Sequence, residues 1–181
     1  MQIKSSLKYR IKTKIYRGTT LYNKLPVHAK SEEFRQYITP NIYDKLYSFC
    51  VVRNPWDWQF SIYNFALKTK KHFRHEFFKK LVSFDSYIRW RCSNDGPFEL
   101  QSDFIKDKNG NLLVNKIIKF ENLDNDFNTV LEELGLPSLK LSKMRSVSQR
   151  RNSYKDSYDD ELINLVSEKF STDIKLFDYS F

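Results

Sequence analysis

The sequence predicts an α/β fold in which short strands alternate with helices. A run of aromatic and β-branched residues at 47–52 indicates a strand, and the segment 53–55 breaks it just before a helical pattern begins. Strand, tight turn and helix in this order form the unit from which α/β sheets are built. A second apolar run at 117–120 also precedes a helical pattern, and a chain of 181 residues can bury a sizeable core. We therefore expect one α/β domain over residues 1–181.

Two helices are expected before the first strand. Apolar residues recur at every fourth position within 1–17, which is typical of a helix with one apolar face, and Ser5 or Ser6 could cap it. The second helix is expected to begin at Ser31, because the two glutamates that follow suit a helix N-terminus. It should end before Pro40.

The first strand and the helix after it carry the clearest local signals. The composition of 47–52 favours a buried strand and is compatible with a parallel sheet. Asn54 suits the N-cap of the next helix and Pro55 suits its first turn, so we expect a helix that runs to about Lys70. Its apolar face would carry three residues: Trp58, Ile62 and Phe65.

The second half of the chain shows turn and helix signals in succession. Asn109-Gly110 is the strongest short signal for a β-hairpin. The apolar pattern at 123–134 predicts a helix that Gly135 ends. Ser157 opens a capping-box pattern for a last helix, and the aromatic segment 177–181 is expected to pack against the core.

The charge balance narrows the partners. Lys and Arg number 31 against 22 Asp and Glu, a net charge of +9 that favours anionic partners. Phosphate or sulfate esters, nucleic acid and acidic surfaces all fit this charge. The charge alone does not choose between them.

Several classes of protein are excluded by the sequence. No apolar run is long enough to span a bilayer, and the first residues do not form a signal peptide. Two cysteines, Cys50 and Cys92, are too few for a disulfide framework or a zinc site, so we expect no metal. A cytoplasmic location fits these observations best.

The sharpest chemical signal lies where the first strand meets its helix. Arg53 would stand at the carboxyl end of the strand, where open α/β sheets bind ligands. Ser61 follows within two helical turns, so its hydroxyl and the guanidinium could hold one phosphate. Alternatively, Arg53 pairs with Asp57 and Ser61 faces solvent. The residues themselves leave both interpretations open.

Here the chain resembles a known family. Residues 53–61 resemble the 3′-phosphate-binding motif of sulfotransferases that use 3′-phosphoadenosine 5′-phosphosulfate (PAPS), and the carbohydrate sulfotransferase group is the nearest. Three further segments are similar to that family in the expected order: 101–123, 126–137 and 154–181. The resemblance covers residues 28–181.

The resemblance implies roles for particular residues. Arg53 and Ser61 would bind the 3′-phosphate of the cofactor. Arg150 or Arg151 would add a second cationic contact, unless both belong to a solvated basic loop. His28 precedes the strand by a spacing similar to that of a catalytic histidine in the uronyl 2-O-sulfotransferase branch, so it is the candidate general base. The alternative for His28 is an ordinary loop histidine.

Other polar residues receive lesser roles. His72, His75 and Glu76 lie in a basic stretch that we expect to be helix with loops. They are further candidates for the base, or else solvated, or contacts for an acidic acceptor. Glu121 is expected to be a hydrogen-bonding residue at a strand end rather than a catalytic one.

One part of the family pattern is not found in this sequence. Relatives begin with a strand and a glycine-bearing loop that holds the 5′-phosphosulfate at a helix N-terminus. Lys4-Ser5-Ser6-Leu7 resembles only the end of that loop, so Ser5 and Ser6 would be its remaining hydroxyl contacts, or a helix cap. The fold implied is a P-loop-like, three-layer parallel sheet flanked by helices, without the first strand and this loop.

The function implied is sulfuryl transfer from PAPS to a hydroxyl group of a carbohydrate. A catalytically impaired chain that only binds a nucleotide or another anion is the first alternative. A basic nucleic-acid-binding protein is the second, although no nucleic-acid-binding module is present. Because animal relatives are anchored in the Golgi membrane, a Golgi or membrane-associated location is the alternative to the cytoplasm.

Overall fold

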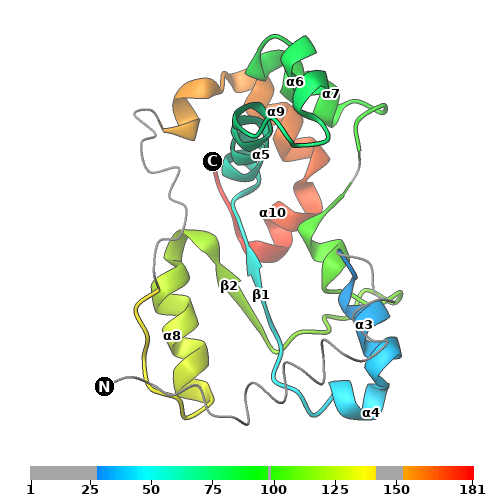
Figure 1. Cartoon of the computed structure of the whole chain (residues 1–181), viewed down its shortest axis with the longest axis vertical. Coiled ribbons are helices and arrows are strands. Elements are labelled where there is room, and N and C mark those ends of the chain that lie inside the picture. Colours follow the sequence, from blue (N-terminus) through cyan, green and yellow to red (C-terminus); the bar gives the residue numbers. More distant parts are fainter. Residues whose placement is uncertain (1–27, 98, 142–152) are drawn as a thin grey trace. The chain divides into compact units, whose positions relative to one another are not determined.

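The computed structural model describes residues 28–97, 99–141 and 153–181. The described residues form a mixed α/β structure with a two-stranded parallel sheet (Figure 1). The strands are β1 (Phe49–Val52) and β2 (Lys116–Lys119). The eight α-helices of the described chain are α3 (Ser31–Ile38), α4 (Pro40–Tyr43), α5 (Pro55–Lys68), α6 (His75–Lys80), α7 (Phe84–Cys92), α8 (Leu123–Glu133), α9 (Asp160–Lys169) and α10 (Ser171–Phe177). Three short 3₁₀ helices are η1 (Gln101–Phe104), η2 (Phe120–Asn122) and η3 (Tyr154–Ser157). The α/β class is thereby confirmed, and the predicted helix within 1–17 lies outside the described residues.

Two compact units account for the described chain. Unit 1 takes in residues 28–48 and 103–115, and unit 2 takes in 49–102 and 116–181 apart from the gaps given above. The expectation of a single domain stays a prediction.

Unit 1 contains α3, α4 and the predicted hairpin turn. The amide of Gly110 donates to the carbonyl of Asp107 at 3.0 Å, and Gly110 has a φ of 85°, which glycine adopts without strain. The hairpin is confirmed, although the described residues beside the turn form one antiparallel bridge, Lys106 to Leu112, rather than full strands. Helix α3 begins and ends as predicted, and Pro40 starts α4 directly after it.

The sheet of unit 2 corrects one expectation about burial. The strands pair in parallel from Phe49↔Lys116 to Val52↔Lys119. Val52 is buried, but Phe49 and Val51 are 40% and 47% exposed, so the prediction of a wholly buried strand is wrong for the described chain. The physical reason is that Phe49 and Val51, two residues apart, share one face of the sheet, and in the described chain that face is less covered than the face of Val52.

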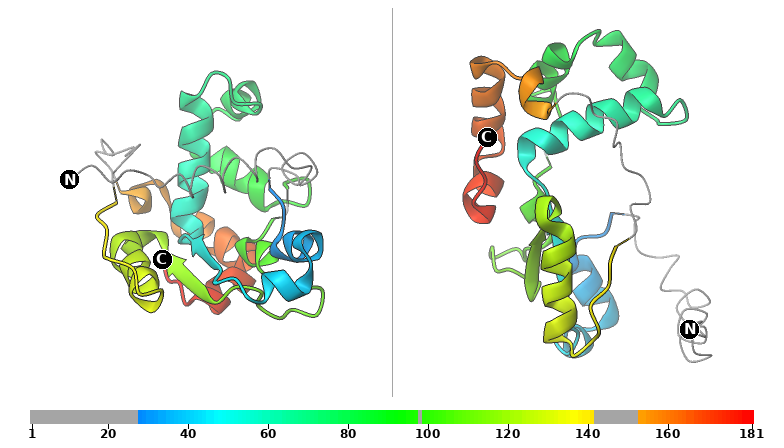
Figure 2. Two further views of the ribbon diagram at one scale, coloured as in Figure 1. Left: turned by 60° about the horizontal axis from the view of Figure 1, so that its bottom comes forward. Right: turned by 90° about the vertical axis from the view of Figure 1, so that its left-hand side faces the viewer.

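Helix α5 forms for the predicted reasons, and two of the three residues of its predicted apolar face, Trp58 and Ile62, pack against the core. The Asn54 side chain accepts the Trp56 amide at 3.1 Å, and Pro55 occupies the first turn. Figure 2 shows α5 extending from β1 as one uninterrupted helix. Its buried stripe contains Trp56, Gln59 and Ala66, whereas Phe65 is 48% exposed. The prediction was wrong for Phe65, which does not belong to the core or to the side chains packed on it and instead contacts the His72 ring.

The core of unit 2 lies among α5, α6, α7 and α9, which gather beyond the carboxyl end of β1 (Figure 1). Its buried members are Trp56, Ala66, Phe78, Tyr87, Ile88, Leu100, Leu162, Val166 and Phe170. The C-terminal segment packs against this core as predicted, since the ring of Phe181 lies 5.7 Å from Trp56 and 5.5 Å from Tyr158.

The last helices differ from the prediction at their start. Asp159, not Ser157, caps α9, because its side chain accepts the Leu162 amide at 2.8 Å. Ser157 belongs to η3, which has its own capping box between Ser153 and Asp156. Aspartate and serine compete as caps, and the acidic side chain also complements the helix dipole.

Replacing Gly96 with alanine is expected to lower the free energy of unfolding by about 3 kcal/mol. A Cβ at this position would lie against the carbonyl oxygen of Trp90 and 2.5 Å from that of Arg91, and backbone atoms cannot move aside as a side chain can. Gly110→Ala is the matched control, since a Cβ there meets open space. It should cost only about 1 kcal/mol of backbone strain. Urea unfolding followed by tryptophan fluorescence would measure both, and equal losses would contradict the expectation.

Candidate anion-binding site

Arg53 and Ser61 meet at the carboxyl end of β1. Arg53 directly follows the strand, and Ser61 lies two turns into α5. The Nη1 atom of Arg53 donates a hydrogen bond to Ser61 Oγ at 2.9 Å. The sequence predicted that these two side chains converge, and the structure brings them together.

Asp57 is the third member of the group. Arg53 Nε lies 2.7 Å from Asp57 Oδ2, and Nη2 lies 2.6 Å from the same oxygen. The pairing of Arg53 with Asp57 that the sequence left open is therefore present. The other part of that alternative, that Ser61 faces solvent, is wrong. Ser61 is half-buried and accepts a hydrogen bond from Arg53.

Phe120 fixes the plane of the guanidinium. The Cζ atom of Arg53 lies over the Phe120 ring at 4.4 Å from its centroid. One N–H of Nη1 and one of Nη2 remain without a hydrogen-bond partner among the described residues. Since the Ser61 hydroxyl accepts from Arg53, its own hydrogen can be donated elsewhere. The group can therefore offer three donors to an anion.

Gln101 holds the backbone of Arg53 in place. Its side chain accepts the Arg53 amide at 2.8 Å and donates to the Arg53 carbonyl at 2.8 Å. Gln101 is itself held by Asp173, which accepts the Gln101 amide at 2.6 Å and the Ser102 amide at 3.0 Å. Asp173 is fully buried, so these two bonds are the interactions that compensate its charge most directly.

Glu121 holds the next residue of the turn. Its Oε1 accepts the Asn54 amide at 2.7 Å, and its Oε2 accepts the Tyr179 hydroxyl at 3.0 Å. The Asn54 side chain also donates to the Ser180 carbonyl at 2.8 Å. Burial, and then the neighbouring Glu121 carboxylate, raise the pKa of Tyr179, so its hydroxyl stays protonated and keeps donating. The predicted hydrogen-bonding role of Glu121 is present.

The remaining predicted residues are distributed as follows. His28 belongs to unit 1 and is exposed. Ser5, Ser6, Arg150 and Arg151 lie outside the described residues.

The further candidates for the base have other partners. His75 is buried, with Nδ1 2.8 Å from the Ala66 carbonyl, so the expectation that it is solvated is wrong. This hydrogen bond packs the start of α6 against α5. His72 stacks beside Phe73, and Glu76 is exposed.

Sequence reasoning did not assign Phe120 a part in the site. The strand register could have indicated it, since the pair Val52↔Lys119 places Arg53 and Phe120 next to each other at the ends of β1 and β2. The two strands were predicted separately and were not paired.

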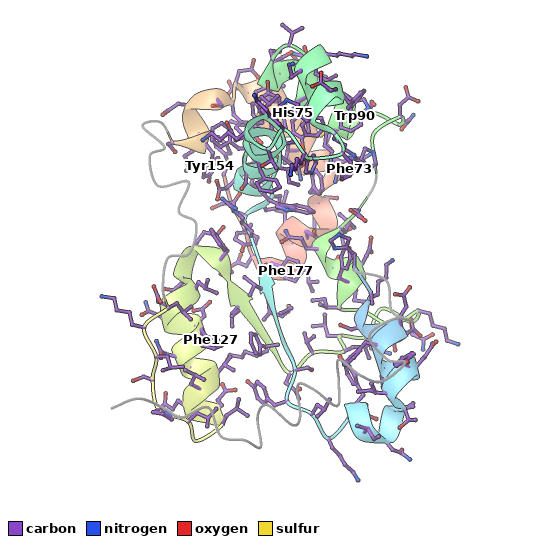
Figure 3. All side chains as sticks on the ribbon, viewed as in Figure 1. Phe73, His75, Trp90, Phe127, Tyr154 and Phe177 are labelled. Carbon is purple, nitrogen blue, oxygen red and sulfur yellow. The ribbon has the colours of Figure 1, made fainter. Side chains whose placement is uncertain are left out.

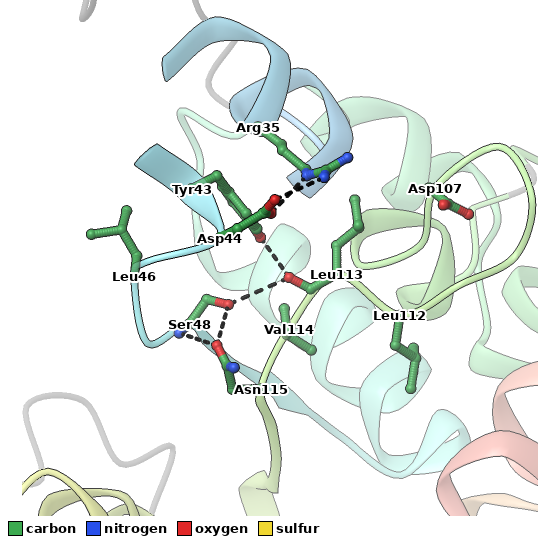
Figure 4. A pocket seen from close by; sticks show the side chains of 10 residues that line it. All are labelled: Arg35, Tyr43, Asp44, Leu46, Ser48, Asp107, Leu112, Leu113, Val114 and Asn115. Carbon is green, nitrogen blue, oxygen red and sulfur yellow. Dashed lines mark hydrogen bonds and ion pairs between the residues drawn. The ribbon is translucent and has the colours of Figure 1, made fainter. Parts of the chain in front are cut away.

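A pocket also occurs in unit 1, apart from the Arg53 group. A pocket of about 300 Å³ is lined by polar side chains from α3, α4 and the residues around the hairpin (Figure 4). Arg35 makes hydrogen bonds of 3.0 and 3.1 Å to Asp44, and these hold the Asp44 pKa below its usual value. Ser48 pairs with Asn115. Because these groups bind one another, we assign the pocket no ligand.

Two kinds of chemistry find no support in the described part of the chain. No group of three or more histidine, cysteine or acidic side chains is arranged there to hold a metal ion. Burial raises the pKa of Cys50 and of Cys92 to about 11, which keeps both thiols protonated and poorly nucleophilic at neutral pH.

None of the described helices combines the length and apolarity needed to cross a membrane.

Comparisons with known proteins give no match for this chain among protein-family models, curated proteins or solved structures.

Proposed function

We propose that this chain is a sulfotransferase that takes the sulfuryl group of PAPS and transfers it to a hydroxyl group. Carbohydrates are the proposed acceptors. The observation that carries the proposal is the convergence of Arg53 and Ser61 at the carboxyl end of β1. The resemblance of residues 53–61 to the 3′-phosphate-binding motif of that family supports it.

The donor set suits a phosphate ester. Two guanidinium N–H groups and one hydroxyl are available as donors, and charge-assisted bonds of this kind are the stronger ones in proteins. Asp57 compensates part of the positive charge, yet it also fixes the direction of the fork. Asp57 takes the Nε side of the guanidinium, so the N–H groups that it leaves unpaired on Nη1 and Nη2 are the ones proposed to bind the phosphate.

The proposal extends to the fold, which we expect to be P-loop-like. We infer a P-loop-like parallel sheet between helical layers from the parallel pairing of β1 with β2 and from the way α5 follows β1. In such sheets ligands bind at the carboxyl ends of strands, which is where Arg53 stands.

The other predicted residues keep their proposed roles. The donor, when bound, would supply the sulfuryl group and leave as adenosine 3′,5′-bisphosphate, while the acceptor hydroxyl would lose its proton to a base. His28 is the proposed base, and a His28→Gln chain with full turnover would remove it from this role. Ser5 and Ser6 are proposed contacts of the 5′-phosphosulfate, and Arg150 or Arg151 of the 3′-phosphate.

Calorimetric titration with adenosine 3′,5′-bisphosphate tests the proposal. We expect one-to-one binding with a dissociation constant in the micromolar range. Adenosine 5′-monophosphate is the control ligand because it lacks only the 3′-phosphate. It should bind about 100-fold more weakly, since two charge-assisted hydrogen bonds are worth about 3 kcal/mol.

Other outcomes have distinct meanings. Equal affinity for the two nucleotides would reject the 3′-phosphate site. Tight binding of the bisphosphate without sulfuryl transfer to any hydroxyl acceptor would support the nucleotide-binding alternative and reject the enzyme.

A further inference from the structure

The segment 65–82 of unit 2 carries an unusual concentration of positive charge. Six lysine or arginine residues stand there against one glutamate. All five lysines of the segment are exposed, and so are both Phe73 and Val82. The segment contains the end of α5, the connection to α6, and α6 itself. It takes no part in the Arg53 site described above.

Aromatic side chains and Arg74 contact one another within this segment and beside it. The ring contacts run from Phe65 to His72 at 5.6 Å and from His72 to Phe73 at 4.8 Å. Arg74 lies over the ring of Phe73 at 5.1 Å and over that of Trp90 at 5.7 Å. We call this surface the basic aromatic patch, and Figure 3 labels Phe73 and Trp90 within it.

Two apolar side chains of the segment project into solvent. Phe73 precedes α6 and is 84% exposed, and Val82 follows α6 and is 87% exposed. Val82 also has a φ of 65°, a backbone conformation that a β-branched residue adopts only with strain. Packing does not compensate the strain, because the side chain has few neighbours. Strained residues of this kind are common at functional surfaces.

We propose that the segment 65–82 docks on a membrane surface rich in anionic lipid headgroups. Clustered lysines are attracted to such a surface, and apolar side chains beside them insert at the boundary of the acyl chains. Val82 has no flat ring with which to stack on a base or a sugar, whereas lipid accepts aliphatic and aromatic side chains alike. Phe73 is 84% exposed, so its ring is free to insert beside the lipid acyl chains.

Vesicle sedimentation with the full chain tests the proposal. We expect binding to vesicles of phosphatidylcholine with 30% phosphatidylserine, and little to phosphatidylcholine alone. Each lysine near the surface contributes about fivefold to partitioning, so the Lys70→Glu, Lys71→Glu double variant should bind at least about 25-fold more weakly. The matched control is Lys45→Glu with Lys175→Glu, which makes the same change of net charge at exposed lysines outside the segment. The control should retain most of the binding.

A second variant separates insertion from plain charge attraction. Phe73→Ala with Val82→Asn leaves the charge unchanged and should lower partitioning about tenfold, because apolar area is no longer removed from water. Asparagine tolerates a positive φ, so the fold should lose nothing at position 82.

Three results would overturn the proposal. These are equal losses in the two charge-reversed chains, no loss in the apolar variant, or binding of a single-stranded oligonucleotide that vesicles fail to displace. The last result would identify the patch as a nucleic-acid surface instead.

Discussion

Asp173→Ala is expected to lower the free energy of unfolding by about 3–5 kcal/mol. The carboxylate is fully buried and accepts the backbone amides of Gln101 and Ser102. Removing it leaves two amide groups without their acceptor, at a cost of about 1–3 kcal/mol each, and adds a small cavity. Urea unfolding monitored by tryptophan fluorescence would measure the loss.

A control at Ser102, whose amide Asp173 accepts, distinguishes lost hydrogen bonds from general disturbance. The Ser102 hydroxyl is buried without a hydrogen-bond partner among the described residues. Ser102→Ala should therefore leave stability unchanged or raise it slightly. Asp173→Asn should fall between the two, since its amide oxygen can accept only part of what the carboxylate accepts. A stability loss in Ser102→Ala as large as in Asp173→Ala would contradict this account.

Asp173→Ala should also affect the geometry of the candidate site. Asp173 holds the backbone of Gln101, whose side chain makes two hydrogen bonds to the backbone of Arg53. A chain without the Asp173 carboxylate is thus expected to hold Arg53 less firmly. The stability of unit 2 and the geometry of the site depend on one buried acid.

The elements that the sequence predicted well are those set by local signals. Asn54 and Pro55 fix the start of α5, Gly135 ends α8 with a φ of 65°, and Asn109-Gly110 makes the hairpin turn. Each of these signals acts over a few residues, so it survives whatever the rest of the chain does.

The features that could not be predicted are set by distant contacts. Gln101 is 48 positions from Arg53, and Asp173 is 72 positions from Gln101. No spacing rule links such residues. The exposure of Val51 had the same origin, because burial of a strand depends on which elements cover it rather than on its own composition.

The candidate site combines residues placed by local signals with one placed by a distant contact. Asp57 and Ser61 stand four residues apart on one face of α5, so their proximity followed from helical geometry, and Arg53 contacts both from the turn just before the helix. Phe120 entered only through the register of two strands that lie far apart in sequence.

Arg53→Ala is expected to weaken the binding of adenosine 3′,5′-bisphosphate by at least about 100-fold. The substitution removes both unpartnered N–H groups and the charge behind them, and hydrogen bonds to charged groups contribute about 1.5–3 kcal/mol each. Arg53→Lys should recover only part of the affinity, because a lysine is a point charge without the fork that Asp57 and Ser61 orient. Calorimetric titration would give both constants, and thermal melting would confirm that the variants are folded.

Two further variants decide whether Arg53 binds the anion or only braces the turn. Arg35→Ala removes another ion-paired arginine, from unit 1, and should leave the affinity unchanged. Asp57→Asn keeps an oxygen that can accept from Arg53 but removes the negative charge beside the proposed phosphate, so it should bind the bisphosphate severalfold more tightly. An Arg53 that served only the fold would give the opposite pattern: Asp57→Asn would lower stability and leave affinity untouched. Tighter binding in Asp57→Asn together with the loss in Arg53→Ala can arise only if the anion lies against this guanidinium.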